Sequence, residues 1–89
     1  MAWKIRLAAS ALKALKKLDR KEARRIRDFL RGLEKLENPR LKGKPLRGPL
    51  GDFWCYRVGP YRLICDLQDK VLTVLVLRIG HRREVYRVN

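Results

Sequence analysis

The chain has 89 residues, enough for a single domain (residues 1–89) with one modest core. Twenty-three lysines and arginines stand against nine aspartates and glutamates, giving a net charge of +14. Self-repulsion at this charge density destabilises a compact state, so we expect an anionic partner: nucleic acid first, an anionic membrane surface second. No apolar run approaches the roughly 20 residues of a membrane span, and the N-terminus does not resemble a signal peptide. These features predict a cytoplasmic protein with no membrane partner.

The N-terminal half predicts a strand followed by two helices. Residues 2–7 alternate apolar and basic side chains, which favours a short strand. Ser10 is expected to cap a first helix over 11–18, and a capping box at Asp19 begins a second helix at about 20–37. The short connection predicts an antiparallel helical hairpin. One side of the second helix is basic and carries Arg24, Arg25, Arg27, Arg31 and Lys35.

Residues 37–52 predict a loop, because three prolines and three glycines interrupt any period. The segment is basic and has no acid between its two ends. Two interpretations stay open: a solvated linker, or a clamp for nucleic-acid phosphates. Its basic residues are Arg40, Lys42, Lys44 and Arg47.

Three strands follow, at 52–58, 61–67 and 71–79. The last is apolar on both faces and is expected to lie centrally in the sheet. The predicted fold is α+β, in the order β-α-α-β-β-β. The N-terminal strand and helical hairpin pack on one face of a mainly antiparallel four-stranded sheet.

The turn at Gly59-Pro60 predicts which side chains share a face of the hairpin. If Val58 pairs with Tyr61, Arg57 lies directly opposite Arg62, with Cβ atoms about 4.5–5.5 Å apart. Two arginines in this position repel each other. Either both guanidinium groups extend into water, or together they bind a phosphate.

The C-terminal segment gathers groups suited to phosphodiester chemistry. His81 is a candidate base, because histidine is the residue type whose unperturbed side chain titrates nearest neutral pH. We expect it to meet Arg57 and Arg62 across the face of the sheet that the helices leave open. Arg82 and Arg83 can stabilise charge on a phosphorane-like transition state, and Tyr86 can transfer a proton or stack on a base. RNA suits this set, since its 2′-OH is an internal nucleophile. The sequence predicts no bound metal and no cofactor, and the spacing of Cys55 and Cys65 favours buried reduced thiols.

Three segments resemble a known family. "LRG" (46–48), "YRVGPYRLI" (56–64) and "IGHRREVYR" (79–87) follow a two-helix half, as in the RelE/ParE superfamily of bacterial and archaeal toxins. The arginine-rich tail that ends in tyrosine is similar to RelE-type mRNA interferases. The resemblance implies a metal-independent endoribonuclease that enters the ribosomal A site and cuts mRNA by 2′-OH attack on the adjacent phosphate.

The resemblance also implies roles for individual residues. Arg57 corresponds to a basic residue that stabilises the transition state, and Arg62 to a phosphate contact. Arg82 corresponds to a general acid or charge stabiliser, and Tyr86 to a residue that stacks on or orients the substrate. The general base stays open between His81, which is preferred, and a thiolate at Cys55. The residues expected to bind nucleic acid without catalysing its cleavage are Lys42, Lys44, Arg47 and Arg83.

The implied partners are the ribosome, mRNA and a RelB-like antitoxin encoded beside the toxin. The toxin alone is expected to be a monomer that forms larger assemblies through its antitoxin. Two alternatives remain: a ParE-like inhibitor of DNA gyrase with the same fold, and an RNA-binding module whose arginines bind without catalysis.

Overall fold

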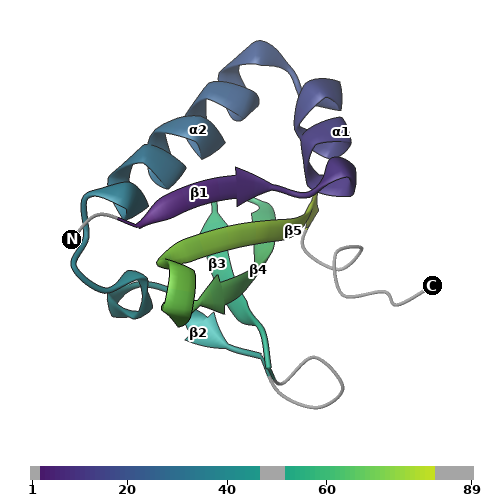
Figure 1. The fold of residues 1–89 in the computed structure, drawn as a ribbon. Helices are drawn as coiled ribbons and strands as arrows, with labels where there is room; N and C mark the ends of the chain where they lie inside the picture. The colour runs from purple at the N-terminus through teal and green to yellow at the C-terminus, as the bar shows by residue number, and fades with distance from the viewer. Residues whose placement is uncertain (1–2, 47–51, 82–89) are drawn as a thin grey trace.

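The computed structural model describes residues 3–46 and 52–81. A strand is followed by two α-helices, a linker and a hairpin that leads into the last strand (Figure 1). The elements are β1 (Lys4–Leu7), α1 (Ala9–Lys17), α2 (Arg20–Glu34), β2 (Lys44–Pro45), β3 (Trp54–Val58), β4 (Tyr61–Gln68) and β5 (Thr73–His81).

The two helices lie together on one side of the sheet, so the predicted α+β class is confirmed. In the described residues the sheet has five strands in the order β1-β5-β4-β3-β2, whereas the sequence predicted four. β1 runs parallel to β5 and the other pairs are antiparallel. β5 is interior, between β1 and β4, as its apolar sequence predicted.

The extra strand comes from the linker, which was predicted to be an irregular loop. Pro39–Leu41 form a turn of 3-10 helix, and Lys44–Pro45 pair with β3 as the edge strand β2. A two-residue strand at a sheet edge has too few residues for a period-2 pattern, so the sequence does not reveal it.

The sequence predicted the N-terminal cap of α2 correctly and that of α1 wrongly. Asp19 caps α2 as predicted, since its Oδ1 accepts a hydrogen bond from the backbone N–H of Glu22 at 2.9 Å. Ser10 does not cap α1, which begins at Ala9. The Ser10 hydroxyl instead donates to the carbonyl oxygen of Leu77 in β5, at 2.8 Å. The prediction for Ser10 was wrong because a backbone acceptor on the sheet, distant in sequence, binds its hydroxyl.

Leu77 is the extra residue of a β-bulge. Cys65 pairs with Val76 and Ile64 with Arg78, so β5 has one more residue than β4 over this stretch. Before the bulge the core-facing residues of β5 are Val74 and Val76. After it the buried residue is Ile79, so the alternation of faces has shifted by one. The bulge therefore decides which residues at the end of β5 face the helices.

Candidate functional site

The hairpin of β3 and β4 aligns the two arginines as predicted. Val58 pairs with Tyr61, and Arg57 pairs with Arg62. The last pair of the hairpin joins Trp54, the first residue of β3, to Cys65. Gly59 has a φ of +57°, the left-handed conformation that a glycine in a two-residue turn supplies without strain.

Arg57, Arg62 and Gly80 form a row across three strands, which we call the arginine row. Directly paired residues share a face, so both guanidinium groups lie on the face opposite the helices. Arg57 is exposed and Arg62 half-buried. Gly80 contributes no side chain to the row. Two neighbouring guanidinium groups on one face are a candidate site for a phosphate.

A surface pocket of about 510 Å³ lies at the β2 side of the arginine row. Lys44 pairs with Cys55, so its side chain shares the face of Arg57, two residues along β3. The lining also includes apolar groups from α2 and the linker. Six of the residues that line the pocket are Phe29, Lys42, Lys44, Leu46, Arg57 and Arg62.

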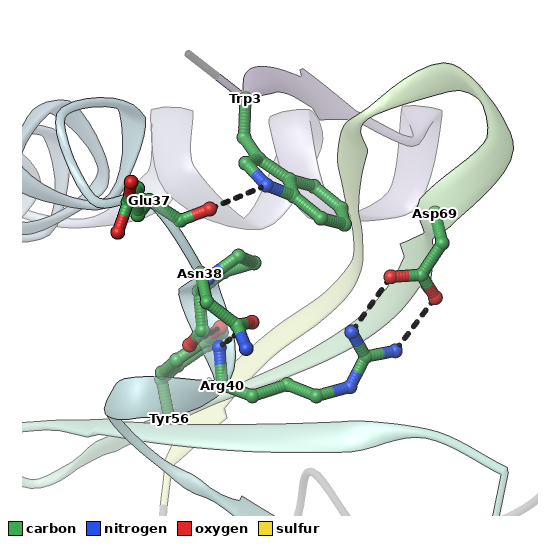
Figure 2. Close-up of polar contacts among 7 residues, drawn as sticks. Trp3, Glu37, Asn38, Arg40, Tyr56 and Asp69 are labelled. Atoms are coloured by element: carbon green, nitrogen blue, oxygen red, sulfur yellow. Dashed lines mark hydrogen bonds and ion pairs between the residues drawn. The ribbon is translucent and has the colours of Figure 1, made fainter. Parts of the chain in front are cut away.

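Aromatic side chains attach the linker to the folded domain (Figure 2). The Trp3 indole donates to the Glu37 carbonyl at 3.2 Å, and the buried Tyr56 hydroxyl donates to the Pro39 carbonyl at 2.7 Å. The Trp54 indole donates to the carbonyl oxygen of Lys42 at 2.7 Å. The bond to Pro39 is buried, where a carbonyl oxygen needs a partner, and the three bonds together attach the linker to the domain.

An ion pair adds a fourth attachment. The Arg40 guanidinium donates to both carboxylate oxygens of Asp69, at 2.8 and 2.9 Å (Figure 2). This bond lowers the pKa of Asp69 and raises that of Arg40. Arg40 also lies over the Trp54 ring, 6.0 Å from its centroid. Arg40 therefore helps to hold the linker in place, in addition to being one of its solvent-exposed cations.

Gly43 allows the linker to approach β3. It has a φ of +76°, and a Cβ atom there would lie 2.6 Å from the Cys55 carbonyl oxygen and 2.7 Å from Trp54 Nε1. Only glycine fits this contact without displacing backbone. The described part of this segment is therefore fixed to the domain, while its residues 40–45 are exposed to solvent. The two interpretations, a solvated linker and a phosphate clamp, both remain predictions.

The structure places His81 away from the arginine row. His81 pairs with Tyr61, and the two rings meet edge to face with centroids 5.6 Å apart. Tyr61 lies next to Arg62 along β4, so His81 faces the helix side of the sheet. The expectation that His81 joins Arg57 and Arg62 across the open face was wrong, because the bulge at Leu77 reverses the facing of the strand end.

Several predicted site residues lie outside the described residues: Arg47, Arg82, Arg83 and Tyr86. Their roles remain predictions. Lys42 and Lys44 both line the pocket. Sequence reasoning missed Phe29 and Leu46, and Gly43 in a basic, proline-containing loop was the one signal of close packing there.

The two thiols differ in their surroundings. Cys65 is fully buried, and burial raises its pKa, so it is a neutral core residue as predicted. Cys55 is half-buried and lines the pocket, which differs from the buried position expected for it. Burial also raises the pKa of the Tyr56 hydroxyl, which stays protonated and donates to Pro39.

A second cationic surface lies on the outer side of α2. Arg20, Arg24, Arg27 and Arg31 line a shallow groove with Asp28, and we call these four arginines the α2 stripe. Asp28 and Arg31 form an ion pair at 4.0 Å. Arg25 does not belong to the stripe, since its guanidinium reaches the turn at Gly59, where a Cβ would lie 2.8 Å away.

Within residues 3–46 and 52–81, no group of three or more His, Cys, Asp or Glu side chains lies close enough together to hold a metal ion. No helix in these ranges is long and apolar enough to cross a membrane.

Comparison with known proteins covers nearly the whole chain. Residues 5–86 match the family model described as the ParE toxin of type II toxin–antitoxin systems. The chain is 33% identical over 87 residues to the toxin RelG of Mycobacterium tuberculosis, covering 98% of this chain and 99% of RelG. It is similarly related to the toxin RelE of that organism, at 32% identity, with 98% and 89% of the two chains covered.

Solved structures agree. The toxin–antitoxin complex RelBE2 of M. tuberculosis matches with a TM-score of 0.83 at 31% identity, over 92% of this chain and 100% of the other. The isolated RelE toxin of E. coli matches with a TM-score of 0.74 at 29% identity, over 96% and 92% of the two chains. The fold, the length and the sequence agree, and the chain belongs to the RelE/ParE family of type II toxin–antitoxin toxins.

Proposed function

We propose that this toxin is a ribosome-dependent endoribonuclease that cleaves mRNA in the ribosomal A site. The observation that supports it is the arginine row. Arg57 and Arg62 are directly paired on the open face, beside a pocket that also holds Lys44. A fold selected only for stability has no use for a repulsive pair of arginines, whereas a phosphate between them converts the repulsion into two charge-assisted contacts.

The proposed reaction needs no external nucleophile. The 2′-OH attacks the adjacent phosphorus, and the bond to the 5′-oxygen of the next nucleotide breaks. The products are a 2′,3′-cyclic phosphate and a 5′-hydroxyl. Negative charge builds on the non-bridging oxygens, where Arg57 and Arg62 stabilise it. Removing one such donor typically costs about 10²–10³ in rate.

Two protons move in this reaction. One leaves the 2′-OH and one reaches the 5′-oxygen. We retain His81 as the acceptor and Arg82 as the donor or charge stabiliser, with Tyr86 orienting the substrate. His81 shares a face with Tyr61, whereas Arg57 and Arg62 lie on the opposite face of the sheet. His81 can therefore accept the proton only if the 2′-OH lies beyond the end of the sheet, past Gly80.

The proposed protein partner is a RelB-like antitoxin. The structures of M. tuberculosis RelBE2 and of the E. coli RelBE complex contain a toxin together with its antitoxin. This chain has a net charge of +14, so an antitoxin segment with acidic residues would screen its self-repulsion. We propose that the free toxin is a monomer and that larger assemblies form through the antitoxin.

Inhibition of DNA gyrase is the second candidate, because the matching family model is described as a ParE toxin. In that case the arginine row would contact a protein, and no RNA would be cut. The two candidates therefore differ in the damage they leave in the cell.

Mapping of mRNA 5′ ends after induced expression tests the proposal. We expect new ends at fixed positions within translated codons, each with a 5′-hydroxyl. Arg82→Ala and Tyr86→Phe should abolish these ends without loss of ribosome binding. His81→Ala should slow cleavage more than it weakens binding. Intact message together with cleaved DNA–gyrase complexes would contradict the ribonuclease proposal and support the ParE-like function.

A further inference from the structure

The pocket beside the arginine row combines cations with an apolar, aromatic wall. Its cationic side is formed by Arg57, Arg62 and Lys44 on the open face. The same lining includes two apolar side chains, Phe29 of α2 and Leu46 of the linker. A nucleotide combines the same two kinds of group, a charged phosphate and a flat aromatic base.

The size and rigidity of the pocket suit such a ligand. Its volume of about 510 Å³ is in the range of clefts, about 300–1,000 Å³, that hold small organic ligands. Its linker wall is held by the hydrogen bonds from Tyr56 to Pro39 and from Trp54 to Lys42, and by the close contact at Gly43. A wall held in this way is formed before the ligand arrives, which lowers the entropy cost of binding.

Phe29 supplies the surface on which a base would stack. It is half-buried, and its ring meets that of Tyr56 at 5.4 Å between centroids with an interplanar angle of 60°. The Lys42 ammonium lies 5.7 Å from the Phe29 centroid. Tyr56 therefore supports the ring from within the core. Lys42 lies over the ring, so its flexible side chain must move aside for a base to stack there.

We propose that this pocket binds the nucleobase of the RNA nucleotide whose phosphate lies between Arg57 and Arg62. The phosphate part of this site rests on the proposed function. The base part rests on the pocket itself. Stacking on Phe29 accepts any base, and differences in stacking strength give a modest preference among bases. The pocket thus holds the base of the nucleotide beside the cleaved bond.

Binding of mononucleotides to the purified full-length toxin tests the proposal without the ribosome. The probes are the four nucleoside 5′-monophosphates and ribose 5-phosphate, which lacks the base. We expect the nucleotides to bind about tenfold more tightly than ribose 5-phosphate, the effect of one base–aromatic stack. Titration followed by NMR chemical shifts measures both affinities.

Variants separate the two halves of the site. Phe29→Leu should remove most of the tenfold difference and leave binding of ribose 5-phosphate unchanged. Arg57→Ala should weaken both probes. Arg24→Ala, the same change of charge on the outer side of α2, should affect neither. Equal affinity of the nucleotides and ribose 5-phosphate for the unchanged protein would overturn the proposal.

A second measurement does not depend on whether Phe29→Leu folds. In the unchanged protein, nuclear Overhauser contacts should join base protons to the Phe29 ring. Contacts to Tyr61 or His81 instead would overturn the assignment. If the toxin binds the base but does not cleave mRNA, the pocket assignment holds and the ribonuclease proposal is wrong. If it cleaves mRNA but does not bind the base, the ribonuclease proposal holds and the pocket assignment is wrong.

Discussion

The arginine row and the α2 stripe are two cationic surfaces made in different ways. The stripe uses residues 20, 24, 27 and 31, a helical spacing that any amphipathic helix would bring to one side. The row needs Arg57 and Arg62 to meet across a hairpin and needs the linker to close one side of the pocket. The hollows beside them are similar in volume, about 500 Å³ at the stripe and about 510 Å³ at the row. The groove at the stripe is lined by charged side chains alone, while the pocket beside the row also has apolar and aromatic side chains. We therefore expect the stripe to contribute affinity and the row to contribute chemistry.

Substitution in the arginine row should have the largest effect. Arg57→Ala should lower the single-turnover rate of ribosome-dependent mRNA cleavage by about 100-fold or more. Because Arg57 and Arg62 would act on one phosphate, the double variant should lose much less than the product of the two single losses.

Lys16→Ala, on the exposed surface of α1, is the matched control for loss of one positive charge and should cleave normally. Multiplicative losses in the double variant would mean that the two arginines act at separate places. The arginine row would then not be a single site, and its difference from the α2 stripe would disappear.

Neutralising the α2 stripe should have an intermediate effect of a different kind. Replacing its four arginines by glutamine should lower ribosome affinity and reduce the slope of log affinity against log salt by up to about three. The cleavage rate of the bound complex should stay within a few fold. A salt slope that stays unchanged would remove the stripe from the RNA contact surface.

Removing one attachment of the linker should have the smallest effect on function, because it changes no charge, and should lower the stability of the domain. Tyr56→Phe removes the donor to the buried Pro39 carbonyl and should cost about 1–3 kcal/mol of unfolding free energy. Thermal unfolding measures this loss, at several degrees of Tm per kcal/mol for a domain of this size.

Tyr61→Phe, next to the hairpin turn and outside the lining of the pocket, is the control for loss of a tyrosine hydroxyl. If the linker positions the pocket, Tyr56→Phe should also weaken nucleotide binding, and Tyr61→Phe should not. Unchanged nucleotide binding in Tyr56→Phe would show that the pocket does not depend on this attachment.

Sequence reasoning succeeded where structure depends on neighbours in the chain. Asp19 caps α2, and the Gly59-Pro60 turn is so short that it sets the pairing of Arg57 with Arg62. The same reasoning recognised the family from its motifs, which the comparisons then confirmed.

It failed for Ser10, for β2 and for the facing of His81. The last two errors have one cause: a strand's partners are chosen by contacts distant in sequence. In a regular ladder His81 would share the face of Arg62. The one extra residue at Leu77 reverses this, and Ser10 supplies a hydrogen bond to the carbonyl of that extra residue.

The sequence by itself therefore determined the charge, the two helices, three of the four arginines of the α2 stripe and the arginine pair, since each follows from composition, from the helical period or from a two-residue turn. It did not separate Arg25, which reaches the turn at Gly59, from the stripe. Tertiary structure alone decided the pocket. Its aromatic wall comes from α2, its linker wall is held by Trp54 and Tyr56, and its cations come from three strands. Contacts between distant segments form only when the whole chain folds, so no local sequence pattern predicts them.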